Sequence, residues 1–281
     1  MRLKGLVIAI ILLGVLCTAG GFMASWQGGK KFTAETEQAF LGLTDQSQPF
    51  LPIVNPKQSM DELPEPVRLY LSKALSDSSK SISSIRIKQT GKIKTTEDSR
   101  WDNLTATQVI SLNPPGLVWS GKVDYAPLTP LTIMTSLLGG KGATQSKLWG
   151  LISLFENKSY SMGKYLLLRW LAEAVWYPEV LLKGKGVKWE QAESNVHDAS
   201  TAKITMEVDD LKVEGEFHFF RSSGAPIFFI GQSIDGYKWY CEYSGWKQIQ
   251  GRQIPTKLVQ GVYHGANRQE RLMIFVDEIE Y

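Results

Sequence analysis

Cysteine and histidine are scarce in this sequence, which holds two Cys and three His among 281 residues. Cys17 lies in an apolar amino-terminal run and Cys241 in a predicted strand, so we expect no disulfide between them. His197, His218 and His264 lie in separate segments with no His or Cys at the spacing of metal ligands. The sequence therefore predicts no metal site and no cofactor.

An excess of one charge is also lacking, since 31 Lys and Arg face 28 Asp and Glu and no basic block exceeds a pair such as Lys30 and Lys31. Nucleic-acid binding needs clustered basic side chains, so we expect no nucleic-acid partner. Gly-x-Ser-x-Gly, His-Glu-x-x-His and glycine-rich dinucleotide motifs are missing from the sequence. We therefore favour a protein that is not an enzyme, with an unrecognised hydrolase as the lesser alternative.

The long apolar run is at the amino terminus, where no charged residue occurs from Gly5 to Trp26. At about 1.5 Å per residue this run spans roughly 33 Å, enough to cross a bilayer. We expect an uncleaved transmembrane signal anchor over residues 1–28. Because Arg2 and Lys4 precede it, we expect the amino terminus inside and the bulk of a single-pass envelope protein on the extracytoplasmic side.

The next segment, residues 29–60, is polar and contains several prolines, and we expect it to be a linker. Residues 61–281 then form the predicted domain. Its first element is an amphipathic helix over residues 63–75, because apolar residues recur there at helical spacing.

Most of the domain shows alternation of apolar and polar residues, which predicts strands. Short turn signals separate these strands and favour consecutive antiparallel hairpins. The predicted strands are 85–93, 104–112, 117–119, 148–155, 202–208, 211–221, 226–230, 237–243, 252–263 and 268–279.

A second helix is predicted over residues 161–177, with Ser161 as its N-cap and Pro178 at its end. This helix is apolar almost all round, so we expect it to be buried against the sheet. The predicted fold class is α+β, mostly β: a curved antiparallel half-barrel closed by helices and preceded by the transmembrane helix.

Four segments resemble an uncharacterised bacterial family, a domain of unknown function, over roughly residues 60–281. They are Leu63–Leu71 (LPEPVRLYL), Pro114–Trp119 (PPGLVW), Leu171–Pro178 (LAEAVWYP) and Ile254–Thr256 (IPT). This resemblance implies no activity. More distantly, Asp235-Gly236 and Gly251–Thr256 are similar to the last hairpins of lipoprotein-carrier proteins of the LolA and LolB type. That similarity implies a curved antiparallel half-barrel with an apolar cavity for acyl chains.

Glu173 is the most informative single residue, because it is an acid among large apolar residues on a helix predicted to be buried. A buried carboxylate must be paired or protonated. An ion pair with Arg169, one helical turn earlier, or with a basic residue of the sheet would be structural. Alternatively, Glu173 is a polar group in an apolar pocket or a general acid.

Aromatic residues could line such a pocket, although such residues more often form the core. The predicted ligand-binding residues are Trp119, Trp170, Glu173, Trp176, Tyr177 and Trp239. The favoured hypothesis is a membrane-tethered extracytoplasmic domain that binds a lipid or other apolar ligand. The alternative is an envelope protein whose sheet recruits another protein.

Overall fold

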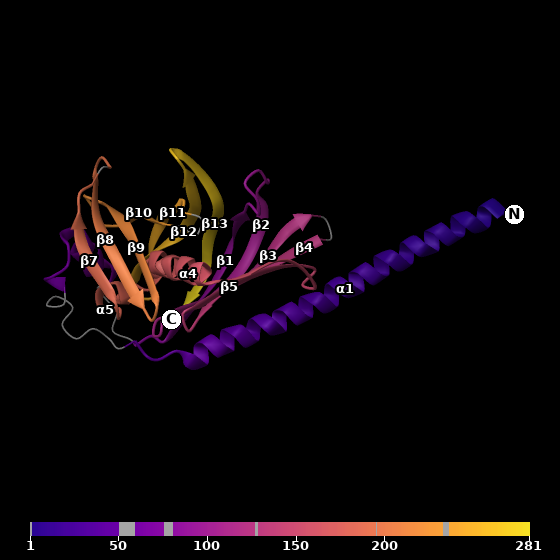
Figure 1. Cartoon of the computed structure of the whole chain (residues 1–281), viewed down its shortest axis with the longest axis horizontal. Coiled ribbons are helices and arrows are strands. Elements are labelled where there is room, and N and C mark those ends of the chain that lie inside the picture. The colour runs from indigo at the N-terminus through magenta and orange to yellow at the C-terminus, as the bar shows by residue number, and fades with distance from the viewer. Residues whose placement is uncertain (1, 51–59, 76–80, 127–128, 195, 233–235) are drawn as a thin grey trace.

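The computed structural model describes residues 2–50, 60–75, 81–126, 129–194, 196–232 and 236–281 (Figure 1). Within these ranges it describes no side chain before Gly20 and none at positions 22, 24 and 183.

One antiparallel sheet of 13 strands dominates the fold, in the order β6-β5-β4-β3-β2-β1-β13-β12-β11-β10-β9-β8-β7. The chain therefore runs as two meanders, β1 to β6 and β7 to β13, which meet where β1 pairs with β13. The strands are β1 Ser84–Ile93, β2 Asp102–Ser111, β3 Gly116–Ala126, β4 Thr129–Leu138, β5 Lys141–Leu148, β6 Ile152–Lys158, β7 Val187–Ala192, β8 Ala199–Val208, β9 Leu211–Phe220, β10 Pro226–Gln232, β11 Lys238–Ile249, β12 Arg252–His264 and β13 Asn267–Glu280.

The predicted antiparallel hairpins are confirmed, and the sheet is curved, but it is not closed, because β6 and β7 remain its two edges (Figure 1). The single strand expected over residues 148–155 is wrong. Trp149 and Gly150 take positive φ angles of 52° and 70°, so the chain turns there and divides the segment between β5 and β6.

Three helical segments follow β6: α4 Tyr160–Ala172, the 3-10 helix η1 Glu173–Trp176 and α5 Glu179–Lys183. Figure 1 shows α4 between the two halves of the curved sheet. Its residues from Leu166 to Ala172 are all buried, as the apolar pattern predicts. The N-cap is Ser159, whose side chain accepts a hydrogen bond from the amide of Met162, and not Ser161 as expected.

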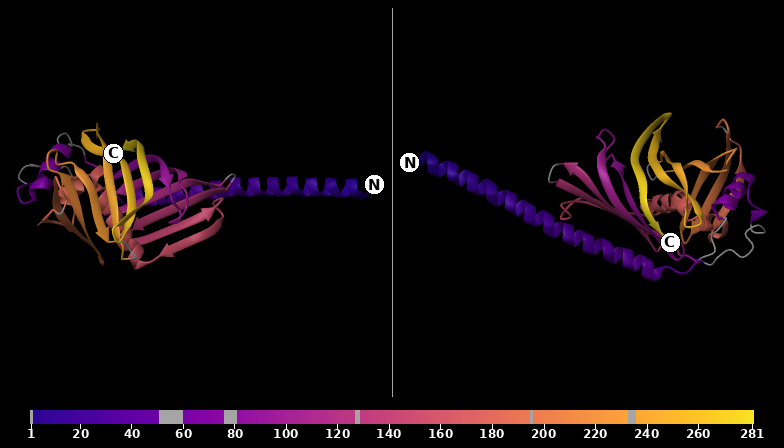
Figure 2. Two further views of the ribbon diagram at one scale, coloured as in Figure 1. Left: turned by 90° about the horizontal axis from the view of Figure 1, so that it is seen from above. Right: turned by 180° about the vertical axis from the view of Figure 1, so that it is seen from behind.

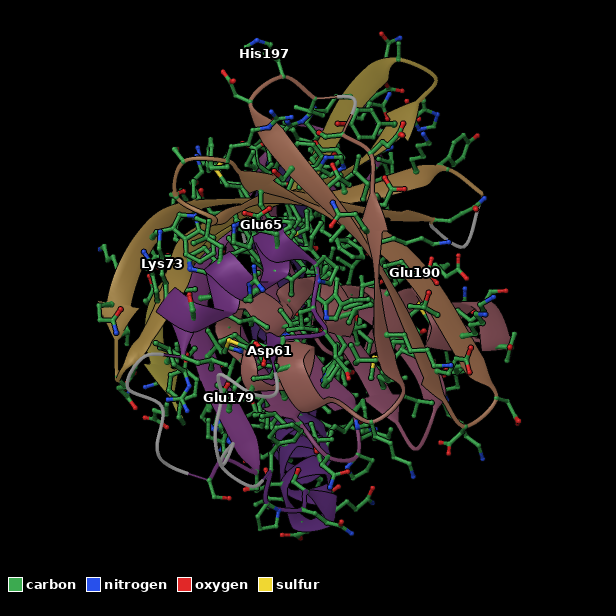
Figure 3. All side chains as sticks on the ribbon, turned by 90° about the vertical axis from the view of Figure 1, so that its left-hand side faces the viewer. Asp61, Glu65, Lys73, Glu179, Glu190 and His197 are labelled. Atoms are coloured by element: carbon green, nitrogen blue, oxygen red, sulfur yellow. The ribbon has the colours of Figure 1, made fainter. Side chains whose placement is uncertain are left out.

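Helix α3 Glu65–Ala74 confirms the first predicted helix of the domain. It packs on β8 and β12, and the Tyr70 hydroxyl donates to the carbonyl of Val175 over 3.4 Å. Figure 3 shows Glu65 and Lys73 on this helix and Glu179 nearby on α5. Helix α3 thereby covers one end of the buried helical layer.

Helix α1 Arg2–Gln46 runs through the predicted anchor and into the predicted linker. Residues 29–46 are therefore helical and not a loose linker, because Phe40 and Leu43 pack against Val109 and Val118 on the face of the sheet opposite to α4. Residues 51–59 of the predicted linker lie outside the described residues. The amino-terminal part of α1 extends away from the sheet (Figure 2).

The side chains of most of the predicted anchor, residues 1–28, also lie outside what the structure describes. Among the residues described, no helix combines the length and the apolar character needed to span a membrane.

Candidate functional site

A cavity of about 330 Å³ lies between α4 and the inner face of the sheet. Strands from both meanders contribute to it, together with the first three turns of α4. The lining residues are Ile93, Lys94, Trp119, Ile133, Thr135, Thr144, Met162, Tyr165, Arg169, Trp239, Gln260, Gly261, Val262, Arg271 and Leu272. Most of these side chains are apolar, and none is acidic.

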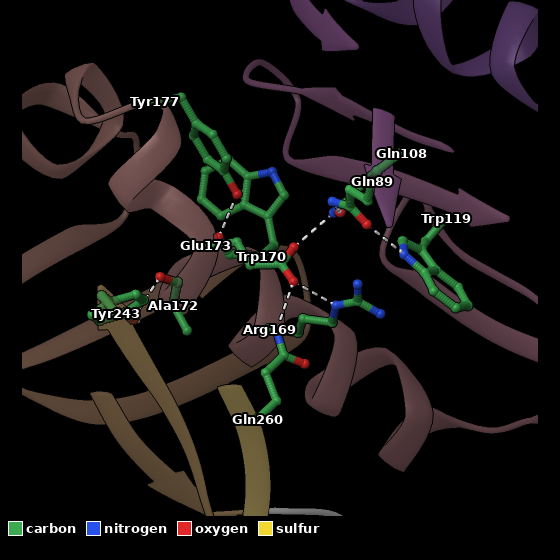
Figure 4. A network of polar contacts seen from close by, with 10 residues as sticks. All are labelled: Gln89, Gln108, Trp119, Arg169, Trp170, Ala172, Glu173, Tyr177, Tyr243 and Gln260. Carbon is green, nitrogen blue, oxygen red and sulfur yellow. Dashed lines mark hydrogen bonds and ion pairs between the residues drawn. The ribbon is translucent and has the colours of Figure 1, made fainter. Parts of the chain in front are cut away.

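Glu173 is the centre of a buried hydrogen-bond network behind this cavity (Figure 4). Its Oε1 accepts from Arg169 Nε over 2.7 Å and from Gln260 Nε2 over 3.0 Å. Its Oε2 accepts from Gln108 Nε2 over 2.6 Å. The carboxylate thus links the end of α4 to β2 in one meander and to β12 in the other.

The network continues from Gln108 to the cavity wall. Gln89 Nε2 donates to Gln108 Oε1 over 3.0 Å, and Trp119 Nε1 donates to Gln89 Oε1 over the same distance. The Trp119 ring is thereby held in one orientation, with the Arg169 guanidinium carbon 5.4 Å from its centroid. A chain of satisfied buried polar groups of this kind keeps a site rigid.

Arg169 is 5% exposed, and among the described members of the network it alone has a buried donor without a hydrogen-bond acceptor. Its Nη2 is buried and has no hydrogen-bond partner among the described residues, and Arg169 lines the cavity. Lys94 and Arg271, which are partly exposed, are the other cations of the lining. Arg271 also lies 3.6 Å from Glu97, outside the cavity.

Of the predicted site residues, Trp119 and Trp239 line the cavity. Trp170, Trp176 and Tyr177 lie in the core and are absent from the described lining. Their polar atoms donate to backbone carbonyls: Trp170 Nε1 to Ser111 and Trp176 Nε1 to Pro255, both over 3.0 Å, and the Tyr177 hydroxyl to Trp170.

Glu173 also stands behind the cavity wall and does not face the space directly. It forms the ion pair with Arg169 that the sequence suggested as the structural alternative.

Sequence reasoning named Arg169 only as a structural partner of Glu173 and missed Gln89, Gln108 and Gln260 as members of the site. A signal was available for two of them, because strict alternation places Gln89 and Gln108 on the same faces of their strands as buried isoleucines. A polar residue at an inward position predicts a buried hydrogen-bond partner. No local pattern in the sequence indicates which residue that hydrogen-bond partner is.

The histidines take no part in this cavity, and the described residues contain no cluster of side chains that could hold a metal ion. His218 is buried on β9, with Nδ1 3.0 Å from the Thr201 hydroxyl and its ring 4.2 Å from that of Phe228. Burial lowers the pKa of His218 to about 4. Burial likewise raises the pKa of the Cys241 thiol, so this cysteine is not an activated nucleophile.

Comparison with known families identifies the chain. The sequence model of a family described as "Family of unknown function (DUF6544)" matches residues 52–269. The chain therefore belongs to this family, which confirms the resemblance found in the sequence. No curated protein matches the chain.

Several solved structures are similar to the chain at low sequence identity. A domain described as an outer membrane lipoprotein-sorting protein domain from Vibrio parahaemolyticus is 8% identical, with 70% of this chain and 85% of that chain covered and a TM-score of 0.41. A LolA superfamily protein from Nitrosomonas europaea is 10% identical, with 76% and 91% covered and a TM-score of 0.43. The MucA/MucB complex of Pseudomonas aeruginosa is 9% identical, with 77% and 94% covered and a TM-score of 0.22.

The distant similarity to lipoprotein carriers that the sequence suggested is found again in the first two of these matches.

Proposed function

We propose that this member of the DUF6544 family is a membrane-tethered, non-enzymatic protein that holds a lipid or other apolar ligand between α4 and the sheet. The observation that carries the proposal is the cavity of about 330 Å³ with a mainly apolar lining. Its volume is at the lower end of the roughly 300–1,000 Å³ typical of ligand pockets. Rings of Trp119, Tyr165 and Trp239 supply much of the wall.

The cavity is supported by groups that resist its collapse. Trp119 is fixed through Gln89, and Arg169 is fixed through Glu173. Tyr165 meets the Trp239 ring edge-on, with centroids 6.0 Å apart. Closing the space would break these contacts, so it remains available to a ligand.

The tether in this proposal is the apolar run from Gly5 to Trp26. Two observations support it: α1 continues as one helix beyond the sheet, and Met23 and Trp26 on that part are 61% and 56% exposed. Lys30 Nζ lies 3.7 Å from the centroid of the Trp26 ring. Trp and Lys are typical of the level where a helix leaves a membrane. In this arrangement the sheet domain is extracytoplasmic.

The tether is tested by extracting membranes of expressing cells with alkaline carbonate. The full chain is expected in the membrane pellet, and a chain that begins at Gly28 is expected in the supernatant. Recovery of the full chain in the supernatant would refute the tether.

Ligand binding is tested by native mass spectrometry of the full chain, released from gentle detergent in the gas phase. A co-purifying lipid is expected on the wild-type chain. Val262→Trp, which places an indole in the cavity, should abolish the adduct, whereas Leu154→Trp on the exposed edge strand should keep it. Adducts that survive Val262→Trp unchanged would place the lipid elsewhere and refute the proposal.

A second candidate function rests on the edge strand β6. Ile152, Leu154 and Phe155 are 51–54% exposed there, and the strand has no neighbour on its outer side among the described residues. Such an edge can accept a strand from another envelope protein. Loss of a cross-linked partner in Leu154→Lys, with the lipid adduct retained, would favour this role.

A further inference from the structure

We infer that the ligand of the cavity is an acidic amphiphile with a single medium-length chain, whose anionic group is bound by the guanidinium of Arg169. This inference deepens the proposed function, since it names the chemical class that the cavity takes.

The first support is the unused donor of Arg169. The guanidinium reaches Glu173 only through Nε, at 2.7 Å, and its Nη2 is buried without a partner among the residues described. A buried N–H group without an acceptor is unfavourable, and charged donors are the most demanding. A ligand that brings an acceptor from the cavity to this guanidinium, after a small rotation of the side chain, removes that penalty.

Glu173 cannot supply the missing acceptor without losing others. Its Oε1 already accepts from Arg169 and Gln260, and its Oε2 accepts from Gln108 over 2.6 Å. Rotating the carboxylate toward Nη2 would leave one of the buried glutamine amides without an acceptor. The network therefore leaves Nη2 without an acceptor in a guanidinium whose residue lines the cavity.

The charge of the lining selects the sign of the ligand. Arg169, Lys94 and Arg271 line the cavity, and the described lining contains no acidic residue. A cationic ligand could in principle bind over the faces of Trp119 or Trp239. The face of Trp119 is already occupied by the Arg169 guanidinium, and the other two cations would repel such a ligand.

The volume of the cavity indicates how much of a ligand it encloses. At roughly 30 Å³ for a water-sized group, a cavity of about 330 Å³ holds about eleven such groups. This corresponds to one chain of about ten carbons with a small head, and because the cavity is partly open, a longer chain would extend out of it. Decanoate is therefore the natural probe.

The experiment measures binding of decanoate, decanol and decyltrimethylammonium by titration calorimetry to the full chain in lipid nanodiscs, with empty nanodiscs as the blank. Decanoate is expected to bind at least tenfold more tightly than decanol, and the cation more weakly than decanol. Equal affinities for decanoate and decanol would overturn this inference and leave the proposed function intact. Absence of binding by all three would overturn both.

The double variant Arg169→Met/Glu173→Leu locates the head, because it removes both charges and leaves no buried ion unpaired. Its decanoate-to-decanol preference is expected to fall to about one, with decanol affinity nearly unchanged. The matched variant Lys94→Gln/Arg271→Gln is expected to keep the preference. If Lys94→Gln/Arg271→Gln loses the preference and Arg169→Met/Glu173→Leu keeps it, the head lies at the partly exposed cations and the inference is overturned.

A measurement on the wild-type chain covers the case in which the double variant does not fold. With ¹⁵N-arginine in the protein and a ¹³C-carboxyl label in decanoate, magnetisation transfer to one buried guanidinium is expected. Transfer that vanishes in Arg271→Gln would assign the contact to that surface arginine instead and contradict the assignment to Arg169.

Discussion

Arg169 and Glu173 form a buried ion pair one helical turn apart, with Nε and Oε1 separated by 2.7 Å and both side chains at most 6% exposed. The pair lies where α4 gives way to η1, and the glutamines of β2 and β12 bind the same carboxylate. The two meanders are distant in sequence, so this carboxylate joins parts of the sheet that the chain itself does not join locally. Its loss should affect both stability and the cavity.

The first prediction is that Glu173→Leu lowers the free energy of unfolding by about 3–5 kcal/mol, because it leaves the Arg169 charge buried without a counter-ion. Arg169→Met/Glu173→Leu should recover the part of the loss that comes from the unpaired charge, but not the part from the Gln108 and Gln260 amides, which lose their acceptor in both variants. Chemical unfolding followed by tryptophan fluorescence measures both changes. The control is Glu278→Leu, which breaks the exposed pair with Lys88 and should change stability far less. A double variant as unstable as the single would contradict this account.

β8 and β9 were predictable because each buries one face and shows strong period-two alternation, whereas β4 and β7 were not predicted from the sequence. The buried helix was predictable for the same kind of reason: residues such as Leu166, Leu167 and Trp170 leave α4 no polar stripe. Both signals are local. They predict strands, a helix and the buried face of each, but they do not predict which strands pair with each other.

The candidate site was less predictable, because its lining comes from eight elements: β1, β3, β4, β5, α4, β11, β12 and β13. The sequence drew attention to Trp170 and Trp176 as readily as to Trp119, since an indole in the core and one at a cavity wall have the same local pattern. What separates them is the packing of β1 against β13, which local alternation does not encode.

Helix α1 was underestimated for a different reason: its buried apolar residues Phe32, Phe40 and Leu43 are few, and a mainly polar stretch separates Phe32 from the other two. A sparse apolar stripe resembles a linker until a partner surface is known. Here the partner is formed by Val109 and Val118, on the outward face of β2 and β3. A chain that begins at Asp61 would uncover this surface.

The second prediction therefore concerns Phe40, which is 2% exposed on the face of α1 that packs against the sheet. Phe40→Ala should cost about 3–5 kcal/mol of stability, as other large-to-small core substitutions do, and should speed amide exchange in residues 32–46. Leu41→Ala is the matched control, since Leu41 is 59% exposed and its loss should stay within about 0.5 kcal/mol. Equal effects of the two substitutions would mean that α1 does not pack on the sheet.

The third prediction concerns the close approach of α1 to the turn between β5 and β6. A Cβ at Gly28 would lie 1.9 Å from the carbonyl oxygen of Trp149 and 2.6 Å from Leu151 Cγ, whereas one at Gly29 would meet nothing within 4 Å. Gly28→Ala should force α1 away from this turn and raise amide exchange at residues 149–152.

Gly29→Ala is the control for that experiment and should leave exchange at the turn unchanged, with a small gain in helix stability of at most about 1 kcal/mol. If Gly28→Ala behaves like Gly29→Ala, the contact between α1 and the turn is not made in solution.

The fourth prediction is a loss of stability in acid that depends on His218. Burial lowers its pKa from 6.5 to about 4, so between these values the unfolded chain binds a proton that the folded chain does not. Stability should therefore fall as pH drops from about 6.5 to 4 and level off below 4 as far as this group is concerned. At about 1.36 kcal/mol per pKa unit the contribution is at most about 3 kcal/mol.

The His218→Gln variant isolates this contribution, because glutamine keeps an acceptor for the Thr201 hydroxyl and does not titrate. Chemical unfolding of both chains across pH 4 to 7 should give curves that converge toward pH 4 as the wild type loses its advantage. Carboxylates remote from His218 affect both chains alike, so the difference between the curves reports His218 together with Glu216, whose Oε2 lies 3.9 Å from the imidazole Nε2. Parallel curves would mean that the imidazole is solvated or finds a counter-ion, and that its burial against Phe228 does not oppose protonation.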